Sequence, residues 1–337
     1  MTHGQRSAPI LLTGAAGFIG SHVAQALLSR GSAVVGVDNL DPYYDPALKY
    51  ANLRSVRNTA DRTGSAFESV EADITDAPAM RRLFERVRPS GVIHLAARAG
   101  VRPSIADPVG YAHTNVTGTS VLLEESRRTG CARFVMASSS SVYGNNTKVP
   151  FAETDDVSTP ISPYASTKRA CELMAYAHWH LTRMPTACLR FFTVYGPRQR
   201  PDLAIGLFLR KISRGEPIAM FGDGSTSRDY TFIEDIVAGT LAAYDRVDGF
   251  GYRIWNLGGN QPVSLSDMIG TIARVVGRKA VIQRQPAQPG DVERTFADLT
   301  RAGTELGYEP RTTLERGVAA QWAWMQGTPA PVGALRA

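Results

Sequence analysis

The sequence predicts an α/β fold, namely a doubly wound parallel sheet with a smaller C-terminal α/β lobe. Short apolar runs alternate with helical patterns as far as Phe192, and parallel strands need such helical crossover connections. Beyond Phe192 the sequence changes to Pro- and Gly-rich connections such as Tyr195-Gly-Pro197. This change indicates a separate, loop-rich lobe.

The expected strands are apolar, β-branched runs that end at small or polar residues. They cover 10–13, 33–37, 67–72, 91–96, 133–137 and 186–192, and the segment 230–258 is expected to return to the same sheet. The first helix is expected over 21–30, where Gly31 closes it. A later helix is expected to begin with Ser162 as its cap and Pro163 at its first position.

Composition points to a soluble globular protein, because 43% of the residues are hydrophobic and 20% are charged. The net charge of +6 is scattered, which favours a solvated surface over a nucleic-acid partner. The sequence shows neither a membrane-spanning apolar run nor a signal-peptide pattern, so we expect a cytoplasmic protein. Cys131, Cys171 and Cys188 lack paired spacing and are expected to be buried free thiols, and no Cys/His pattern predicts a metal.

A glycine motif, GAAGFIG, follows the first strand and opens the first helix. In this context glycines allow a tight turn and let a pyrophosphate approach backbone N–H groups at a helix N-terminus. The alternative is a tight turn with no ligand. The residues expected at the cofactor are Gly14, Gly17, Phe18, Ile19 and Gly20.

Asp38 ends the next strand, about 20 residues beyond the loop, where a carboxylate accepts hydrogen bonds from the adenosine ribose. Its charge repels a 2′-phosphate, so NAD is predicted rather than NADP. Further strand ends lie where adenine and pyrophosphate would run along the carboxyl edge of the sheet, although a strand-end cap or sheet packing also explains them. These residues are Asn39, Asp73, Ile74, Ala96 and Ala97.

Tyr164 and Lys168 lie four residues apart on a predicted helix and therefore share one face. An ammonium near a tyrosine hydroxyl favours phenolate over phenol, which makes Tyr164 a candidate general base. The serine run Ser138 to Ser141 ends a strand of the same sheet, at the edge where ligands bind. Such pairs and runs also occur by chance in helices and turns, and only their combination predicts a site.

Together these motifs resemble the extended short-chain dehydrogenase/reductases, and within them the nucleotide-sugar 4-epimerases. The resemblance covers nearly the whole chain and includes GAAGFIG, HLAA, SSSSVYG, YASTK, RFFTVYGP and SRDYTFIEDIV. It implies that Ser139, Tyr164 and Lys168 are catalytic, that Tyr164 and Lys168 also lie at NAD, and that Asn115 is on the cofactor side. Arg228 resembles the arginine that grips the substrate diphosphate, a task suited to a guanidinium.

The resemblance also bears on the reaction and the substrate. Dehydratases and decarboxylases of the family carry an acidic residue where this chain has Ser140 and Ser141, so an epimerase is favoured. Thr193, with the segments 198–202, 288–292 and 42–46, resembles the UDP-glucuronate 4-epimerases. Pro163 is more typical of neutral-sugar enzymes, so a UDP-glucose or UDP-N-acetylglucosamine 4-epimerase stays an alternative; a decarboxylase, dehydratase, reductase or silent nucleotide-binding protein is disfavoured.

In the hypothetical mechanism Tyr164 takes the proton of the 4-hydroxyl, Ser139 aligns that oxygen, and hydride passes to NAD. The 4-keto sugar turns over and the steps reverse. Restraint of the uronate carboxylate, which prevents loss of carbon dioxide, is assigned to Ser141, Thr193 and Arg200. The predicted substrate-binding residues are Ser140, Ser141, Thr193, Arg200, Arg228, Gln288 and Asp291.

The change of pattern beyond Phe192 predicts the domain organisation. We expect an NAD-binding Rossmann domain at 1–191, to which 230–258 returns, a substrate-binding lobe at 192–229 and 259–326, and a mobile tail at 327–337. The resemblance further implies a homodimer formed by helices near 111–129 and 164–180.

Overall fold

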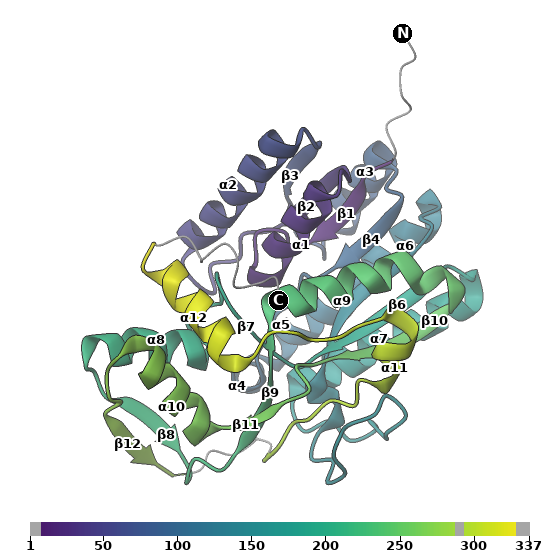
Figure 1. Cartoon of the computed structure of the whole chain (residues 1–337). Coiled ribbons are helices and arrows are strands. Elements are labelled where there is room, and N and C mark those ends of the chain that lie inside the picture. The colour runs from purple at the N-terminus through teal and green to yellow at the C-terminus, as the bar shows by residue number, and fades with distance from the viewer. Residues whose placement is uncertain (1–7, 287–292, 328–337) are drawn as a thin grey trace. The chain divides into compact units, whose positions relative to one another are not determined.

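The computed structural model describes residues 8–286 and 293–327, which divide into two compact units (Figure 1). The first unit runs to Val142 and includes Ser162–Arg190 and Gly239–Trp255. The second comprises Tyr143–Ile161, Phe191–Ala238 and the described chain from Asn256 onward. Residues 328–337, most of the expected mobile tail, lie outside the described residues.

The main sheet has seven strands in the order β10-β6-β5-β4-β1-β2-β3. From β1 the chain builds outward through β2 and β3, then crosses to β4 on the other side of β1. This reversal between β1 and β4 marks the edge where doubly wound sheets bind ligands. The strands are β1 (Ile10–Thr13), β2 (Val34–Asp38), β3 (Phe67–Glu71), β4 (Gly91–His94), β5 (Phe134–Ser139), β6 (Thr186–Phe191) and β10 (Tyr252–Leu257). The predicted fold class is confirmed. Of the segment 230–258, which is expected to return to this sheet, β10 lies in it, whereas residues 230–232 belong to a strand of the second unit.

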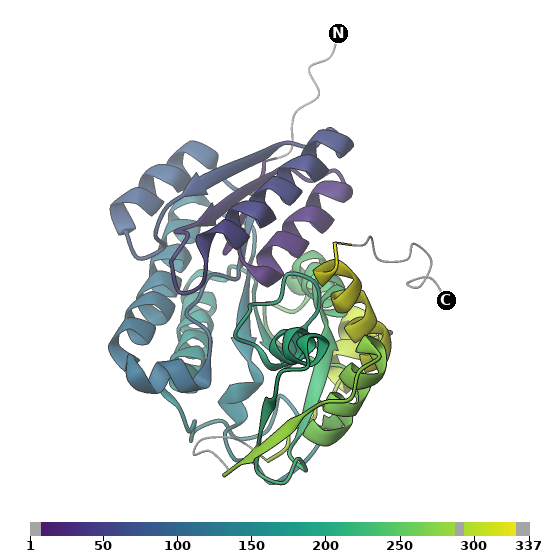
Figure 2. The same cartoon turned by 90° about the vertical axis from the view of Figure 1, so that its left-hand side faces the viewer.

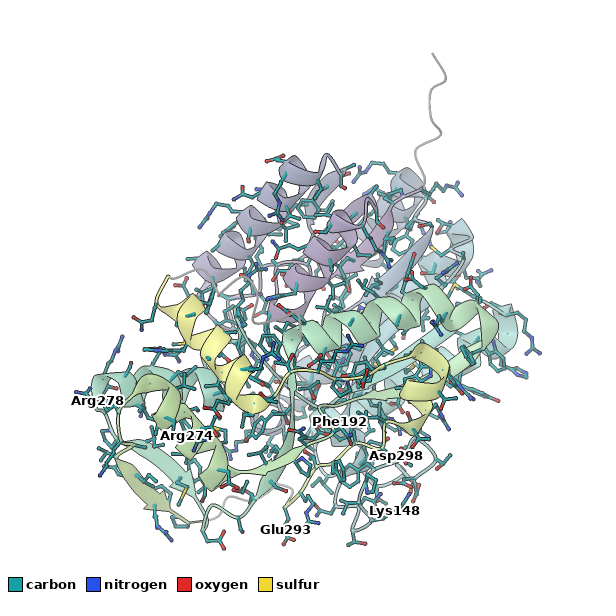
Figure 3. All side chains as sticks on the ribbon, in the orientation of Figure 1. Lys148, Phe192, Arg274, Arg278, Glu293 and Asp298 are labelled. Atoms are coloured by element: carbon teal, nitrogen blue, oxygen red, sulfur yellow. The ribbon has the colours of Figure 1, made fainter. Side chains whose placement is uncertain are left out.

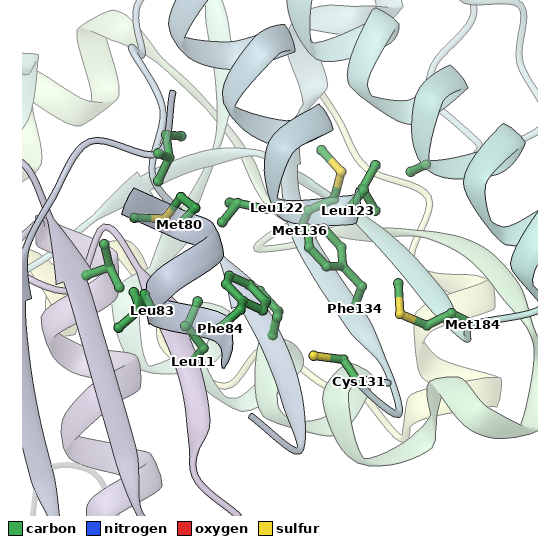
Figure 4. Packing of buried hydrophobic residues seen from close by; sticks show 14 of the residues in the cluster. Leu11, Met80, Leu83, Phe84, Leu122, Leu123, Cys131, Phe134, Met136 and Met184 are labelled. Carbon is green, nitrogen blue, oxygen red and sulfur yellow. The ribbon is translucent and has the colours of Figure 1, made fainter. Parts of the chain in front are cut away.

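Helices cover both faces of this sheet. On one face α1 and α2 pack together, as the turned view of Figure 2 shows. On the other face, α3 and α6 contribute Met80 and Leu122, both labelled in Figure 4, to one buried cluster with the strands. Cys171 of α7 belongs to the same cluster. The helices are α1 (Phe18–Ser29), α2 (Pro46–Thr63), α3 (Ala77–Val87), α4 (Val101–Ala106), α5 (Pro108–Ala112), α6 (Gly118–Thr129), α7 (Pro163–Thr182) and α9 (Ile233–Arg246), with a π-helical turn η1 (His113–Thr117) and 3₁₀ turns η2 (Ser140–Tyr143) and η3 (Val247–Gly249).

The second unit is built on a three-stranded sheet, in which β9 lies between β11 and β7, and a two-stranded parallel pair, β12 and β8. Helices α8, α10 and α12 pack against one another. The elements are β7 (Thr193–Tyr195), α8 (Ala204–Arg214), β8 (Ile218–Phe221), β9 (Ser227–Phe232), β11 (Pro262–Ser264), α10 (Leu265–Val276), β12 (Ile282–Gln285), α11 (Thr300–Leu306) and α12 (Leu314–Met325).

The segment Tyr143–Ile161 groups with this second unit, whereas the sequence placed it before the lobe. Phe151 explains the difference, since its backbone N–H donates to Phe296 and its ring packs against that of Phe192, labelled in Figure 3. Phe151 and Phe192 are both buried, and because they lie far apart in the sequence the local pattern did not reveal their contact.

Helix boundaries follow their caps. Ser162 Oγ accepts from the Ala165 N–H at 3.1 Å and Pro163 is the first helical residue, as predicted for α7. Helix α1 begins at Phe18, earlier than the expected Ser21, because the helix starts directly at the glycine motif. Among the described helices, none has both the length and the apolar character needed to cross a membrane.

Candidate active site

The glycine motif forms the tight turn between β1 and α1. Gly14 has φ of +72°, and a Cβ there would lie 2.8 Å from the Ala96 nitrogen. A Cβ on Gly20 would lie 1.9 Å from the Gly14 carbonyl oxygen. Both glycines are therefore required by contacts inside the protein, and any other residue would push the loop away from β4 or from α1.

The N-terminus of α1 has neither a side-chain cap nor an acidic residue in its first turn. Gly17 is the cap residue, followed by Phe18 and Ile19. By contrast, Asp45 and Asp76 cap α2 and α3 through their side chains. An uncapped helix start behind a glycine turn fits a pyrophosphate, which accepts hydrogen bonds from the first N–H groups of the helix.

Asp38, at the end of β2, holds the glycine turn in place. One carboxylate oxygen accepts from the Ala16 N–H at 3.0 Å and the other from the Leu40 N–H at 2.9 Å. Lys49 of α2 places its Nζ 3.8 Å from the second oxygen. Asp38 is thus a clamp on the turn as well as a candidate ribose acceptor, and the sequence suggested only the second role.

The neighbouring strand ends carry a second polar pair. Asn39 Nδ2 donates to Asp73 at 2.9 Å. Burial opposes ionisation of Asp73, but hydrogen bonds from Thr75 and Asn39 outweigh it and hold the pKa of Asp73 below its usual value. Ile74 is buried beneath α6, where a Cβ on Gly118 would lie 2.5 Å from its Cδ1.

A buried polar chain links β1, β4 and α6. The Ala96 N–H donates to Thr13 Oγ1 at 3.2 Å, and Thr13 Oγ1 lies 2.7 Å from His94 Nδ1. His94 Nε2 lies 3.1 Å from Thr119 Oγ1, which donates to the Asn115 carbonyl at 2.6 Å. These directions fit a neutral His94 protonated at Nε2, and burial, aided by the charge of Lys168, lowers the pKa of His94 to about 3.

Asn115 lies in the π-helical turn before α6 and is buried. Its Oδ1 accepts from the Arg98 N–H at 2.8 Å, and its Nδ2 donates to the Arg98 carbonyl at 3.0 Å and to Thr167 Oγ1 at 3.0 Å. The side chain therefore fixes the backbone just after Ala97 at the end of β4 and ties it to α7.

The catalytic candidates come from the end of β5 and the start of α7, two elements that pack together. Ser139 Oγ lies 2.8 Å from Ser141 Oγ and accepts from the Ser141 N–H at 3.1 Å. Lys168 is buried and donates from Nζ to the Ala137 carbonyl at 2.8 Å. The half-buried Tyr164 ring meets the ring of Tyr111 edge to face, with centroids 6.2 Å apart.

A buried ion pair lies behind these residues. Glu172, 0% exposed, accepts from Arg190 Nε and Nη2 at 2.9 Å each and from Ser138 Oγ at 2.6 Å. Arg169 Nη1 adds a bond at 3.1 Å. Burial opposes its ionisation, but Arg190, Ser138 and Arg169 together hold the pKa of Glu172 below its usual value. The cluster joins α7 to β5 and β6.

The predicted substrate residues outside the first unit lie on separate elements of the second. Thr193 begins β7 and pairs with Tyr230 of β9. Arg200 forms a two-point ion pair with Asp202, with distances of 3.1 and 2.7 Å. Arg228, on β9, donates to the Ser227 carbonyl at 2.9 Å. Gln288 and Asp291 lie outside the described residues.

Ser140 is half-buried in the 3₁₀ turn that follows β5. Neither it nor Ser141 is acidic, so the turn after Ser139 offers hydroxyl groups but no carboxylate. In residues 8–286 and 293–327, no three His, Cys, Asp or Glu side chains gather as a metal site.

Sequence reasoning missed Lys49, Thr167, Glu172 and the Thr13–His94–Thr119 chain as parts of the site. Glu172 carried a usable signal, because it follows Lys168 by one helical turn and so belongs to the same face of α7. Lys49 had no such sequence signal, since its partner Asp38 lies on a different element.

Comparisons with known proteins add independent findings. The family model described as GDP-mannose 4,6 dehydratase matches residues 11–321. The chain is 42% identical to a UDP-glucuronate 4-epimerase of Thermodesulfobacterium geofontis, over 93% of this chain and 95% of that protein. It is also 42% identical to UDP-glucuronate 4-epimerase 3 of Arabidopsis thaliana, over 96% of this chain and 77% of that protein.

Two solved structures are similar over 95% of this chain and 99% of theirs. One is a UDP-glucuronic acid 4-epimerase from Bacillus cereus in complex with UDP-glucuronic acid and NAD, with 34% identity and a TM-score of 0.87. The other is a UDP-glucose 4-epimerase from Thermotoga maritima with UDP-glucose, with 33% identity and a TM-score of 0.84.

Proposed function

The chain belongs to the extended short-chain dehydrogenase/reductases, in the family matched by the GDP-mannose 4,6 dehydratase model, and we propose that it is an NAD-dependent UDP-glucuronate 4-epimerase. The enzyme would interconvert UDP-glucuronate and UDP-galacturonate through a 4-keto intermediate. The observation that carries this proposal is the 42% identity with UDP-glucuronate 4-epimerases across nearly the whole chain. A UDP-glucose 4-epimerase is the second candidate, supported by Pro163 and by the Thermotoga maritima structure.

The first unit fits NAD at the glycine turn. The uncapped start of α1 would hold the pyrophosphate, Asp38 would accept from the adenosine ribose, and Lys168 would bind the nicotinamide ribose. When bound, NAD supplies reversible oxidation at the carbon that bears the hydroxyl. Asn115 and His94 would act indirectly, since their bonds fix the strand ends beside that site.

Tyr164 would hold and return the proton of the 4-hydroxyl, and Ser139 would orient that oxygen. The Ser141 N–H donates to Ser139 Oγ, and the hydroxyl of Ser141 lies 2.8 Å away, so a substrate oxygen would compete with Ser141 for the Ser139 hydroxyl. Because Ser140 and Ser141 carry no carboxylate, this turn lacks the extra acid or base of the dehydratases and decarboxylases. That difference supports epimerisation over elimination.

The uronate substrate brings its own hazard, since a 4-keto uronate is a β-keto acid that loses carbon dioxide when its carboxylate aligns with the carbonyl. We assign restraint of this carboxylate to Ser141, Thr193 and Arg200, and recognition of the diphosphate to Arg228. Asp202 would keep the Arg200 guanidinium oriented until a substrate carboxylate competes for it.

Homodimer formation and a cytoplasmic location are also part of the proposal. Leu173, Tyr176 and Leu181 are large apolar residues on α7 that are 53%, 48% and 80% exposed. Leu173 and Tyr176 are three residues apart and therefore share one face of α7, and an exposed apolar stripe of this kind fits a symmetric helical interface. The three cysteines are buried free thiols, which suits a reducing compartment.

The test is incubation of the purified protein with UDP-glucuronate, without added cofactor, followed by chromatography or proton NMR of the nucleotide sugars. UDP-galacturonate at equilibrium, with no UDP-pentose, is the expected result. Epimerised UDP-glucose together with untouched UDP-glucuronate would replace the proposal with its second candidate. A UDP-pentose product would indicate a decarboxylase.

A further inference from the structure

We propose that the pocket for the adenosine ribose is a masked 2′-phosphate site, in which Lys49 is the phosphate-binding cation and Asp38 neutralises it. The inference rests on the proposed binding of NAD at the glycine turn. It makes Lys49 a second determinant of the choice between NAD and NADP, acting against Asp38.

The pair is buried and close. The side chains of Lys49 and Asp38 are 9% and 11% exposed, and Lys49 Nζ lies 3.8 Å from Asp38 Oδ1. Two backbone N–H groups, from Ala16 and Leu40, hold the carboxylate at the end of β2. The ammonium is held from α2 and lies 5.1 Å from the centroid of the Tyr44 ring. Neither charge has much freedom to turn towards solvent.

Because Lys49 and Asp38 carry opposite charges, the repulsion of a 2′-phosphate cannot be judged from Asp38 alone. A lone carboxylate at the ribose would repel a 2′-phosphate strongly, whereas a carboxylate beside an ammonium repels it less. Asp38 has a further role that an amide would keep in part, because an amide oxygen also accepts a backbone N–H. Replacement of Asp38 by Asn therefore removes the negative charge, keeps the size of the side chain and leaves the Lys49 ammonium uncompensated.

A buried ammonium without a counter-ion costs free energy, so an anion that binds beside it is favoured. Two other carboxylates at this strand edge have different partners, because Asp73 accepts a hydrogen bond from the neutral amide of Asn39 and Asp41 lies 3.9 Å from Arg98. A 2′-phosphate on the adenosine ribose would supply the missing negative charge with several acceptor oxygens. The Asp38→Asn enzyme is thus expected to prefer NADP, and the gain is expected to require Lys49.

The experiment compares wild type, Asp38→Asn, Lys49→Met and the double variant. Each protein is equilibrated with equal concentrations of NAD and NADP, separated from free nucleotide and denatured, and the released dinucleotides are quantified by chromatography. We expect wild type to retain NAD, Asp38→Asn to raise the bound NADP/NAD ratio by at least about tenfold, and the double variant to lose most of that gain. Lys49→Met alone should lower the ratio below that of wild type.

Thermal unfolding with and without NADP provides a second readout that does not depend on turnover. NADP should raise the melting temperature of Asp38→Asn more than that of the double variant, and added salt should reduce the difference. An equal gain of NADP in the double variant would overturn the inference, as would a higher ratio in Lys49→Met. If Asp38→Asn does not fold, the bound NADP/NAD ratio of Lys49→Met decides alone, because the inference requires this ratio to lie below that of wild type. Failure of the wild type to bind either dinucleotide would instead count against the proposed function.

Discussion

At the residue scale, the site depends on which hydroxyls are committed to the protein and which are left for a substrate. Thr13, Thr119 and Ser138 are engaged in buried hydrogen bonds, while Tyr164 is half-buried with its ring against Tyr111. Sequence reasoning predicted roles for Tyr164, Lys168 and Ser139 from the spacing of two of them on one helix, the place of the third at a strand end, and the family resemblance. It found no partner for His94, because Thr13 and Thr119 come from two other elements.

The proposed proton transfer makes Tyr164→Phe the most informative substitution. Loss of the hydroxyl removes the acid and base and leaves the ring packing, so turnover should fall by about 10²- to 10⁴-fold with the fold intact. Initial rates of UDP-glucuronate epimerisation and circular dichroism would measure this. Tyr50→Phe, on the exposed side of α2, is the matched control and should keep full turnover. Undiminished turnover in Tyr164→Phe would remove Tyr164 from the mechanism.

The lowered pKa of His94 predicts how the free energy of unfolding depends on pH. Its folded pKa is lowered from 6.5 to about 3, so the unfolded chain binds its proton first as the pH falls. The contribution of His94 to the free energy of unfolding is fully present above pH 6.5. It is lost progressively below that pH, by about 1.4 kcal/mol per pH unit, until the pH nears 3. Between pH 7 and pH 5 the loss from this one residue should be about 2 kcal/mol.

Urea unfolding at pH 7, 6 and 5 measures that loss. His94→Gln is expected to be less stable at pH 7 but to show a flatter pH dependence than wild type, because the carboxylates common to both proteins cancel in the comparison. His180→Gln, exposed at the end of α7, should retain the wild-type slope. Equal slopes in wild type and His94→Gln would contradict the prediction.

At the element scale, α7 carries the proposed proton-transfer groups on a helix that is fixed at two points. Lys168 contacts the backbone of β5, and one turn later Glu172 binds Ser138 of β5 and Arg190 of β6. The start of α7 was predictable from Ser162 and Pro163, since caps are local signals. The clamp was not, because Arg190 is distant in sequence and reads as an ordinary strand residue.

Glu172→Ala should lower the free energy of unfolding by about 3–5 kcal/mol, since it leaves the Arg190 charge buried without its carboxylate. Glu172→Gln keeps the shape and some hydrogen bonds and should cost less. Glu124→Gln on α6 breaks an exposed pair with Arg127 and should change stability by less than about 1 kcal/mol. Chemical unfolding of the three variants measures this; similar losses for Glu172→Ala and Glu124→Gln would refute the clamp.

At the scale of the whole molecule, the alternation of strands and helices was enough to predict the main sheet and the existence of a second unit. Right-handed crossovers reduce the number of strand orders that a parallel sheet allows, but the order itself comes from the structure. The assignment of Tyr143–Ile161 was not predictable, because it depends on the packing of Phe151 with Phe192 rather than on position along the chain.

The proposed dimer is tested on the exposed stripe of α7. Leu173→Arg puts a charge on this face in both subunits of a symmetric pair and should shift the protein from dimer to monomer. Size-exclusion chromatography with light scattering gives the mass. Leu48→Arg on α2, a leucine that is 40% exposed, is the control and should leave the mass unchanged. A monomeric wild type, or a Leu173→Arg protein that stays dimeric, would rule out this interface.

The serine run at the end of β5 makes the site sensitive to a deletion in that strand. Successive strand residues face opposite sides of a sheet, and here Ser138 binds Glu172 while Ser139 pairs with Ser141. A deletion of one residue earlier in β5 would move Ser139 into the place of Ser138 and Ser140 into the place of Ser139, so serines would still fill both strand positions. The place of Ser141 would pass to Val142, and the hydroxyl that lies 2.8 Å from Ser139 Oγ would be lost. The number of serines in this stretch therefore matters as well as their presence.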